Sequence, residues 1–348
     1  MTDLAWHRET TAVCVTGMHR SGTSFTMRAL HLLGLELGAE DTLMAPGPDN
    51  RAGYWENRLV KELDDELLAE LGGSWDQPPL VEAGWERADD LDPWRQRAAD
   101  ILEASFGHVA AGTRIGFKDP RLSLLLPFWR TVVDITTTII VVRDPREVAA
   151  SLATRNGLHP SHAALLWMRY LFAAARHDPG HLVLTHAEFF ADTDGAVDRI
   201  VAHLGFDPPT PDTRRAISGH LDPALRHHVA GEDPTVDPVL RLALDVWNGG
   251  RPDLTALPPH VTDALAGGWL RAPADGEALT KARSDAVRFK EHLRARNEKI
   301  RVMTEEIEQL RATLAGHSEP EPEPGSGDDP TLGGPTDPEP GATEPGAG

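Results

Sequence analysis

The sequence of 348 residues contains a single cysteine, Cys14. One cysteine excludes an intramolecular disulfide framework and a multi-cysteine metal site, which fits a protein of a reducing compartment. No apolar run approaches the roughly 20 residues that span a bilayer. The N-terminal residues are mostly polar and lack the basic and then apolar pattern of a secretory signal. We therefore expect a cytoplasmic protein without a transmembrane segment.

Basic residues are also few. Lys and Arg together number 34 against 54 Asp and Glu, which gives a formal net charge of −20. A charge of this sign argues against a nucleic-acid partner, because phosphate backbones are bound by basic surfaces. The histidines are scattered without an HExxH or similar spacing, so we expect no metal site. A small anionic ligand remains compatible, since a few arginines at helix ends can hold a phosphate in an acidic protein.

The sequence divides into three regions. Residues 317–348 consist mainly of Pro, Gly, Glu and Asp without Lys or Arg, which predicts a disordered, solubilising tail. Residues 279–315 carry apolar residues at alternating three- and four-residue steps, interrupted only at Arg296. This pattern predicts a coiled coil for self-association or for a partner helix, and an amphipathic helix on its own domain is the alternative. Residues 10–272 form the predicted folded domain.

Short β-like runs alternate with helical patterns in residues 10–272. This alternation is typical of an α/β fold, in which helices flank a parallel sheet. We expect strands at residues 12–16, 113–117, 137–142 and 181–185. We expect helices at residues 22–35, 58–71, 93–109, 145–156 and 160–176. The order of the strands within the sheet does not follow from these patterns.

A glycine-bounded loop joins the first expected strand to the first expected helix, as in P-loop folds. The loop consists of Gly17, Met18, His19, Arg20, Ser21, Gly22, Thr23 and Ser24. Its glycines let successive backbone N–H groups converge on one anion, and the following helix adds the positive end of its dipole. In the Walker pattern a lysine follows the second glycine. Here Thr23 has that place and Arg20 is the basic residue, so the loop predicts a phosphate site unlike that of a nucleotide triphosphatase.

A second anion site is expected where strand 137–142 ends. Arg143 follows that strand, and the carboxyl ends of strands bind ligands in open α/β sheets. Asp144 can cap the next helix, with Pro145 in its first turn. Ser151 lies on the same helix and adds a hydroxyl to the charged fork of Arg143, a pair suited to a phosphate monoester. The alternative is a salt bridge at the helix start with a packing serine.

Both motifs resemble those of the sulfotransferase superfamily. GMHRSGTS, residues 17–24, resembles the 5′-phosphosulfate loop in the arginine-bearing form of tyrosylprotein and many bacterial sulfotransferases. VVRDPREVAASLATRNG, residues 141–157, resembles the 3′-phosphate site, and the resemblance covers roughly residues 12–247. It implies transfer of a sulfuryl group from 3′-phosphoadenosine 5′-phosphosulfate to a hydroxyl or amine, without a metal. Related sequences often close the nucleotide site near residues 221–228, so Arg226 is either a further donor contact or part of a surface helix end.

The resemblance also suggests catalytic residues. Arg20 is the candidate that stabilises charge on the leaving phosphate oxygen, and Lys118, in the family-like segment GFKDPR, is the second. Glu56 follows Tyr54 and Trp55, and a carboxylate shielded by aromatic rings is a candidate general base. Capping of the next helix is the alternative role of Glu56. His19 is an alternative base, unless it only packs or donates to phosphate.

The acceptor is expected to be a small molecule or a glycan. A carbohydrate is the first choice by analogy, beside a glycolipid precursor or a secondary metabolite. Trp75, Trp85 and Trp94 could line an acceptor site, although core packing is the simpler interpretation. Two other functions stay open, a P-loop phosphotransferase using ATP and magnesium, and a non-catalytic coiled-coil scaffold.

Overall fold

The computed structural model describes residues 10–47, 53–79, 81, 83–178, 180–220, 238–250, 252 and 254. All of them belong to one compact unit, Met1–Val287. The expected coiled coil at 279–315, the acidic tail at 317–348 and Arg226 lie outside the described residues. No helix in the described part of the chain is long and apolar enough to cross a bilayer.

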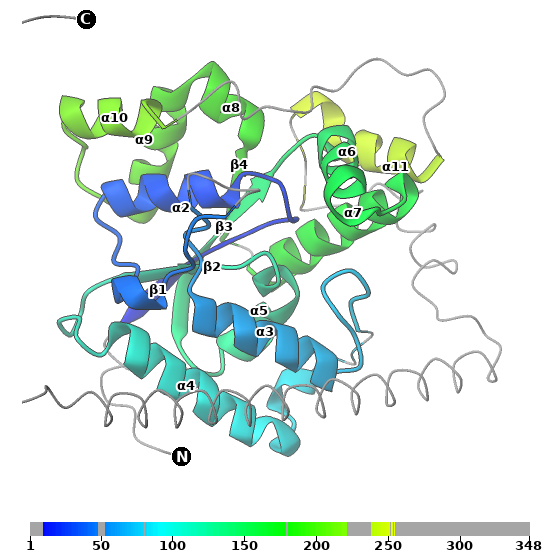
Figure 1. Ribbon diagram of the computed structural model, residues 1–348. Helices are drawn as coiled ribbons and strands as arrows, with labels where there is room; N and C mark the ends of the chain where they lie inside the picture. The colour runs from blue at the N-terminus through cyan, green and yellow to red at the C-terminus, as the bar shows by residue number, and fades with distance from the viewer. Residues whose placement is uncertain are drawn as a thin grey trace, which may run out of the picture. The chain divides into compact units, whose positions relative to one another are not determined.

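The centre of the fold is a parallel sheet of four strands in the order β2-β1-β3-β4 (Figure 1). The strands are β1 (Thr11–Thr16), β2 (Ile115–Lys118), β3 (Asp134–Val142) and β4 (Leu182–Thr185). The α/β prediction is confirmed, and each expected strand is present with its ends shifted by at most three residues. β3 begins earlier than expected because its first residues alternate between exposed and buried positions before the continuous apolar run.

Five helices lie where the sequence predicts them: α2 (Thr23–Leu32), α3 (Arg58–Glu70), α4 (Asp92–Phe106), α6 (Pro145–Asn156) and α7 (Pro160–His177). Five others were not expected: α5 (Leu122–Trp129), α8 (His186–Ala191), α9 (Thr193–Leu204), α10 (Pro211–Ser218) and α11 (Pro238–Trp247). Short 3₁₀ turns are η1 (Glu40–Thr42), η2 (Trp85–Arg87), η3 (Asp89–Leu91) and η5 (Asn248–Gly250). α5 lacks a helical period because it is apolar almost throughout and contains Pro127.

Helices cover both faces of the sheet. On one face, Val13 and Val15 of β1 pack in a cluster with α2, α8 and α9. On the other face, Ala12 and Cys14 pack with α3, α4 and α5, and further along the sheet β3 packs with α6, α7 and α11. Figure 1 shows α2, α8, α9 and α10 on one side of the strands and α3, α4 and α5 on the other. The carboxyl ends of the parallel strands therefore meet at one edge, where the glycine-bounded loop leaves β1.

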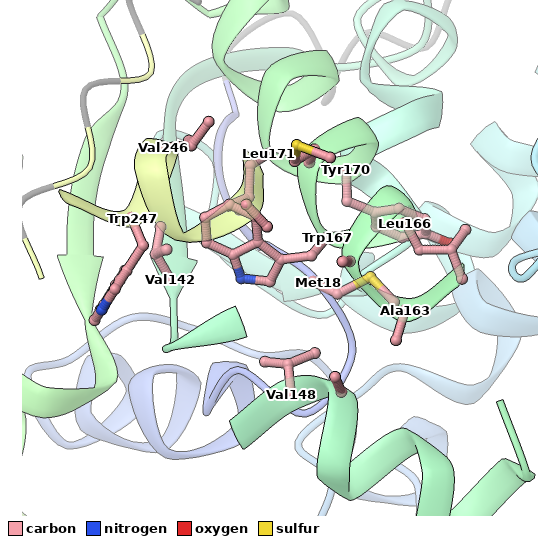
Figure 2. Packing of buried hydrophobic residues seen from close by; sticks show 14 of the residues in the cluster. Met18, Val142, Val148, Ala163, Leu166, Trp167, Tyr170, Leu171, Val246 and Trp247 are labelled. Carbon is pink, nitrogen blue, oxygen red and sulfur yellow. The ribbon is translucent and has the colours of Figure 1, made fainter. Parts of the chain in front are cut away.

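The core extends into that loop. Met18 is fully buried and lies among Val142 of β3, Val148 of α6 and Trp167 of α7 (Figure 2). The Trp167 indole Nε1 donates a hydrogen bond of 2.9 Å to the carbonyl oxygen of Arg143, the first residue after β3. One apolar cluster thus fixes both the loop after β1 and the end of β3.

A carboxyl group is buried where α3 meets α5. Asp64 of α3 is completely buried and accepts a hydrogen bond of 2.8 Å from the Trp129 indole Nε1 of α5. Its second oxygen, Oδ2, has no hydrogen-bond partner among the described residues. Burial, and after it the charge of Asp119, raise the pKa of Asp64 well above the usual 3.8. The folded protein therefore favours a protonated Asp64.

Replacement of Asp64 by asparagine should stabilise the protein at neutral pH. Because the pKa of Asp64 is higher in the folded than in the unfolded protein, folding takes up a proton. The Asp64 side chain therefore favours folding at low pH and lowers the stability as the pH rises above the pKa of the unfolded state. The asparagine side chain would keep an acceptor for Trp129 and carry no charge. Thermal unfolding should show a higher Tm for Asp64→Asn at neutral pH, and the advantage should shrink as the pH falls toward about 4.

The matched control is Asp100→Asn on the neighbouring helix α4, where the carboxyl group is exposed. Its stability should stay within about 0.5 kcal/mol of the wild type at every pH, as is usual for surface substitutions. A Tm of Asp64→Asn below that of the wild type at neutral pH would contradict a protonated Asp64.

Candidate functional site

The loop between β1 and α2 has the backbone of an anion cradle. Gly17 has a φ of 137°, and a Cβ atom there would collide with the carbonyl oxygen of Val141 on β3. Gly22 has a φ of 96° and precedes α2 without a side-chain cap on the helix. Arg20 also has a positive φ, 70°, which is uncommon for a residue with a side chain. These conformations curve the loop tightly at the start of a helix, where backbone N–H groups attract anions.

Two polar atoms of the loop fit a bound anion or an ordered water. Ser21 is fully buried, and its hydroxyl oxygen has no hydrogen-bond partner among the described residues. The Nε2 atom of His19 is likewise buried without a partner in the described part of the chain. Buried polar groups are almost always satisfied, so each of these atoms calls for a partner beyond the described residues.

The two predicted anion sites meet in the structure. The Arg20 Nε donates a hydrogen bond of 3.0 Å to the Ser151 hydroxyl on α6. Arg143 donates from Nη1 to the carbonyl oxygen of Arg20 at 3.2 Å and from Nε to the Glu147 carboxylate at 2.7 Å. Ser151 is 4% and Arg143 8% exposed. Two arginines and one serine, from segments far apart in the sequence, therefore form one hydrogen-bonded group.

The end of β3 positions Arg143 as the sequence predicts. The Asp144 side chain caps α6 by accepting a hydrogen bond of 2.8 Å from the backbone N–H of Arg146, and Pro145 is the first residue of the helix. The indole of Trp167 holds the Arg143 carbonyl oxygen. Both contacts fix the backbone of Arg143, so its guanidinium is held beside the loop.

A second group of candidates meets at the end of β2. The Lys118 ammonium donates hydrogen bonds to the Glu56 carboxylate at 2.5 Å and to the Ser24 hydroxyl at 3.1 Å. Lys118 is 2% and Glu56 8% exposed, so the ion pair is almost entirely removed from water. Lys118 thus connects the candidate base Glu56 to the loop that carries Arg20.

The segment before α3 holds Glu56 in place. The residue that caps α3 is Asn57 and not Glu56, because the Asn57 side-chain oxygen accepts from the backbone N–H groups of Leu59 and Val60. The Asn57 amide also donates a hydrogen bond of 2.8 Å to the Ser105 hydroxyl. The carbonyl oxygen of Glu56 accepts a hydrogen bond of 2.8 Å from the Met44 N–H. The carboxylate of Glu56 is therefore left to pair with Lys118.

His19 lies in an aromatic environment. Its ring centroid is 4.6 Å from that of Trp75 and 5.8 Å from that of Tyr170. Burial lowers the pKa of His19 well below the usual 6.5, and the nearby cations, Arg121, Lys118, Arg155 and Arg20, lower it further. The imidazole is therefore neutral at neutral pH, packed on rings, while Glu56 has the direct contact with Lys118.

A buried turn after β2, not predicted from the sequence, supports Lys118. The hydroxyl of Thr16, at the end of β1, donates a hydrogen bond of 3.1 Å to the carbonyl oxygen of Asp119. The same hydroxyl lies 2.8 Å from the Ser123 hydroxyl. Arg121 donates from Nη1 to the Asp119 carboxylate at 3.0 Å and from Nε to Asp65 at 2.5 Å. The signal that could have indicated this turn is the charged Asp-Pro-Arg run directly after an apolar strand. These bonds join the ends of β1 and β2 and so hold the loop and Lys118 together.

The three candidate acceptor tryptophans all pack against the core. Trp75 packs against two apolar clusters, one formed with α6 and α7 and one formed with α3 and α4. Trp85 and Trp94 pack only against the cluster formed with α3 and α4. This packing favours the structural interpretation for Trp85 and Trp94. No group of three His, Cys, Asp or Glu side chains within the described ranges could hold a metal ion.

Comparison with known proteins gives solved structures only. No family model matches the sequence, and no curated protein matches it. A sulfotransferase domain from the Synechococcus PCC 7002 olefin synthase is 18% identical with a TM-score of 0.36, over 76% of this chain and 95% of that one. Sulfotransferase STF1 from Mycobacterium tuberculosis H37Rv is 18% identical with a TM-score of 0.38, over 63% of this chain and 73% of that one. Sulfotransferase STF9 from Mycobacterium avium is 15% identical with a TM-score of 0.37, over 66% and 71%. All three of these solved structures are sulfotransferases.

Proposed function

We propose that this chain is a sulfotransferase that moves a sulfuryl group from 3′-phosphoadenosine 5′-phosphosulfate to a hydroxyl or amine acceptor. The observation that carries the proposal is the hydrogen bond of 3.0 Å between Arg20 and Ser151. It joins the two anion sites that the sequence suggests separately. A ligand with two anionic groups fits such a pair of sites better than one with a single phosphate chain.

The donor would be held by residues of both sites. The loop of residues 17–24 suits the 5′-phosphosulfate, because its backbone N–H groups, Arg20 and the Ser21 hydroxyl, which has no partner among the described residues, all favour an anion. Arg143 and Ser151 suit the 3′-phosphate, since both are buried beside the loop. Arg226 remains a further candidate for the 3′-phosphate from outside the described residues.

The transfer step uses the second group of candidates. The acceptor oxygen or nitrogen forms a bond to sulfur while the bond from sulfur to the 5′-phosphate oxygen breaks, and that oxygen keeps the electron pair. The acceptor proton goes to Glu56, and the products are the sulfated acceptor and adenosine 3′,5′-bisphosphate. Arg20 stabilises the charge that grows on the leaving oxygen. Lys118, in contact with both Glu56 and Ser24, supplies positive charge between acceptor and donor.

Glu56 is the preferred general base and His19 the alternative. Glu56 is preferred because Lys118 links its carboxylate to Ser24 of the loop. The His19 ring instead packs on Trp75 and Tyr170. The acceptor class follows from analogy, with a carbohydrate first, then a glycolipid precursor or a secondary metabolite.

Calorimetric binding of adenosine 3′,5′-bisphosphate tests the donor site. We expect binding without magnesium, and Arg143→Ala should weaken it about tenfold or more through the loss of a charge-assisted contact. Ser151→Ala removes only a hydroxyl and should weaken binding less. Arg130→Ala is the matched control, because Arg130 pairs with Asp178 before β3 and β4 and away from the loop.

Magnesium-ATP is titrated in parallel. If magnesium-ATP binds instead of the bisphosphate, the chain is a phosphotransferase, and the proposal is wrong. If neither ligand binds, the donor site does not exist and a non-catalytic role takes its place.

A further inference from the structure

The segment between α3 and η2 is tied to α7. We call residues 73–79 of this segment the strap. Three α7 side chains donate hydrogen bonds to its carbonyl oxygens: His162 Nε2 to Asp76 at 2.7 Å, Arg169 Nη2 to Pro79 at 2.5 Å, and the Tyr170 hydroxyl to Trp75 at 2.7 Å. The strap also closes its own turn, since the Ser74 N–H donates 2.9 Å to the Gln77 carbonyl oxygen. An irregular segment with this many fixed carbonyls is held in one conformation.

The strap places Trp75 against the phosphate loop. The Trp75 ring lies 4.6 Å from the His19 ring at an interplanar angle of 57°. The Tyr170 ring also lies near His19, with ring centroids 5.8 Å apart and an interplanar angle of 64°. Tyr170 therefore both holds the strap, through its hydroxyl, and contacts the loop, through its ring. His19 thus has two aromatic neighbours, Trp75 from the strap and Tyr170 from α7. The strap and α7 are themselves joined by hydrogen bonds.

The residue after His19 has a strained backbone. Arg20 has a φ of 70° although it carries a long side chain. Such conformations persist where the surrounding structure imposes them, and they gather at functional sites. On the other side of His19, Met18 is buried in the core (Figure 2). Its carbonyl oxygen accepts a hydrogen bond of 3.2 Å from the Ser21 N–H. With Met18 and His19 both fixed, the turn at Arg20 directs its guanidinium to Ser151.

We propose that Trp75 is a positioning residue for the donor site. Through His19 it holds the loop in the conformation that brings Arg20 to Ser151, in addition to its packing in the core. The identity of the donor rests on the proposed function, whereas the effect of Trp75 on the conformation of the loop does not.

The test combines hydrogen–deuterium exchange of the loop with calorimetry of adenosine 3′,5′-bisphosphate. In the ligand-free protein, Trp75→Ala should speed exchange of the amides of residues 17–24 by about tenfold, because the loop opens locally. It should also weaken bisphosphate binding by about tenfold. Trp75→Phe keeps a ring on His19 and should stay close to the wild type in both measurements.

Trp94→Ala is the matched control. Trp94 is also a partly buried tryptophan packed against the core, but it lies on α4 beside Arg97. It should leave exchange of the loop and bisphosphate affinity unchanged. If the loop of Trp75→Ala exchanges no faster than that of Trp94→Ala, the proposed role of Trp75 is wrong.

Tyr170→Phe provides a milder variant if Trp75→Ala does not fold. It removes only the hydroxyl that donates to the Trp75 carbonyl oxygen and keeps the ring near His19. We expect faster exchange in both the strap and the loop, and unchanged exchange in the loop would count against the proposal. If the wild type binds no bisphosphate but the variants show the expected differences in exchange, the proposed donor is wrong and the role of Trp75 in the loop is supported.

Discussion

Replacement of Arg20 by alanine should lower the rate of sulfuryl transfer by about 10²–10³, the range found when one donor to a developing oxyanion is removed. The charge on the leaving phosphate oxygen grows only as the sulfur–oxygen bond breaks, so Arg20 contributes more in the transition state than in the bound state. Affinity for adenosine 3′,5′-bisphosphate should therefore fall less than the rate. Single-turnover transfer to any acceptor used by the wild type, beside calorimetry, measures the two effects.

Arg20→Lys is the informative partner of this variant. Lysine keeps the positive charge but cannot reproduce the planar donor fork that reaches Ser151. We expect a rate between those of the wild type and Arg20→Ala. An Arg20→Ala protein that transfers at the wild-type rate would remove Arg20 from the mechanism.

Replacement of Lys118 by methionine should destabilise the protein by about 3–5 kcal/mol, because the substitution leaves a buried carboxylate without its partner. Glu56 is 8% exposed and pairs with the Lys118 ammonium at 2.5 Å. Transfer should be lost as well, since Lys118 connects Glu56 to the loop. Urea unfolding of the wild type and of Lys118→Met measures the loss of stability.

A second substitution separates charge from shape. In the double variant Lys118→Met, Glu56→Gln both side chains of the buried pair are uncharged. Most of the lost stability should return, whereas sulfuryl transfer should not. Arg58→Met is the control for a surface pair: Arg58 lies 3.3 Å from Glu62, both side chains are about half exposed, and its loss should cost less than about 1 kcal/mol. Equal stability of Lys118→Met and the wild type would show that Glu56 is not a buried charge.

Local signals predict two candidate anion sites, and the strand order brings their residues together. The loop and the Arg143–Ser151 segment each show their chemistry within a short stretch of sequence. The bond from Arg20 to Ser151 spans 131 residues and depends on β1 lying beside β3. The contact of Lys118 with Ser24 depends in the same way on β2 lying beside β1. Periodicity within a segment carries no information about which strands are neighbours.

Two features that the sequence did not predict, α5 and the contact of Trp75 with His19, lack a local signal. α5 is apolar on nearly every side because it is buried between the sheet and α7, so it has no polar face to reveal its period. The contact of Trp75 with His19 depends on hydrogen bonds between α7 side chains and the carbonyl oxygens of an irregular segment. Side chains that bind backbone carbonyls leave no residue pattern in the segment that they hold.

The hydrogen bond between Arg20 and Ser151 also has a consequence for selectivity. Because the two candidate anion sites share this bond, a group that entered one site would change the hydrogen-bond partner in the other. The resulting coupling free energy would be the same in both directions. Free phosphate or sulfate would contact only one of the two candidate sites and would disturb the shared bond without replacing it at both ends. A molecule that carries two anionic groups at the right separation can satisfy both ends at once. The chain would thereby distinguish one long dianionic ligand from the many small anions that compete with it.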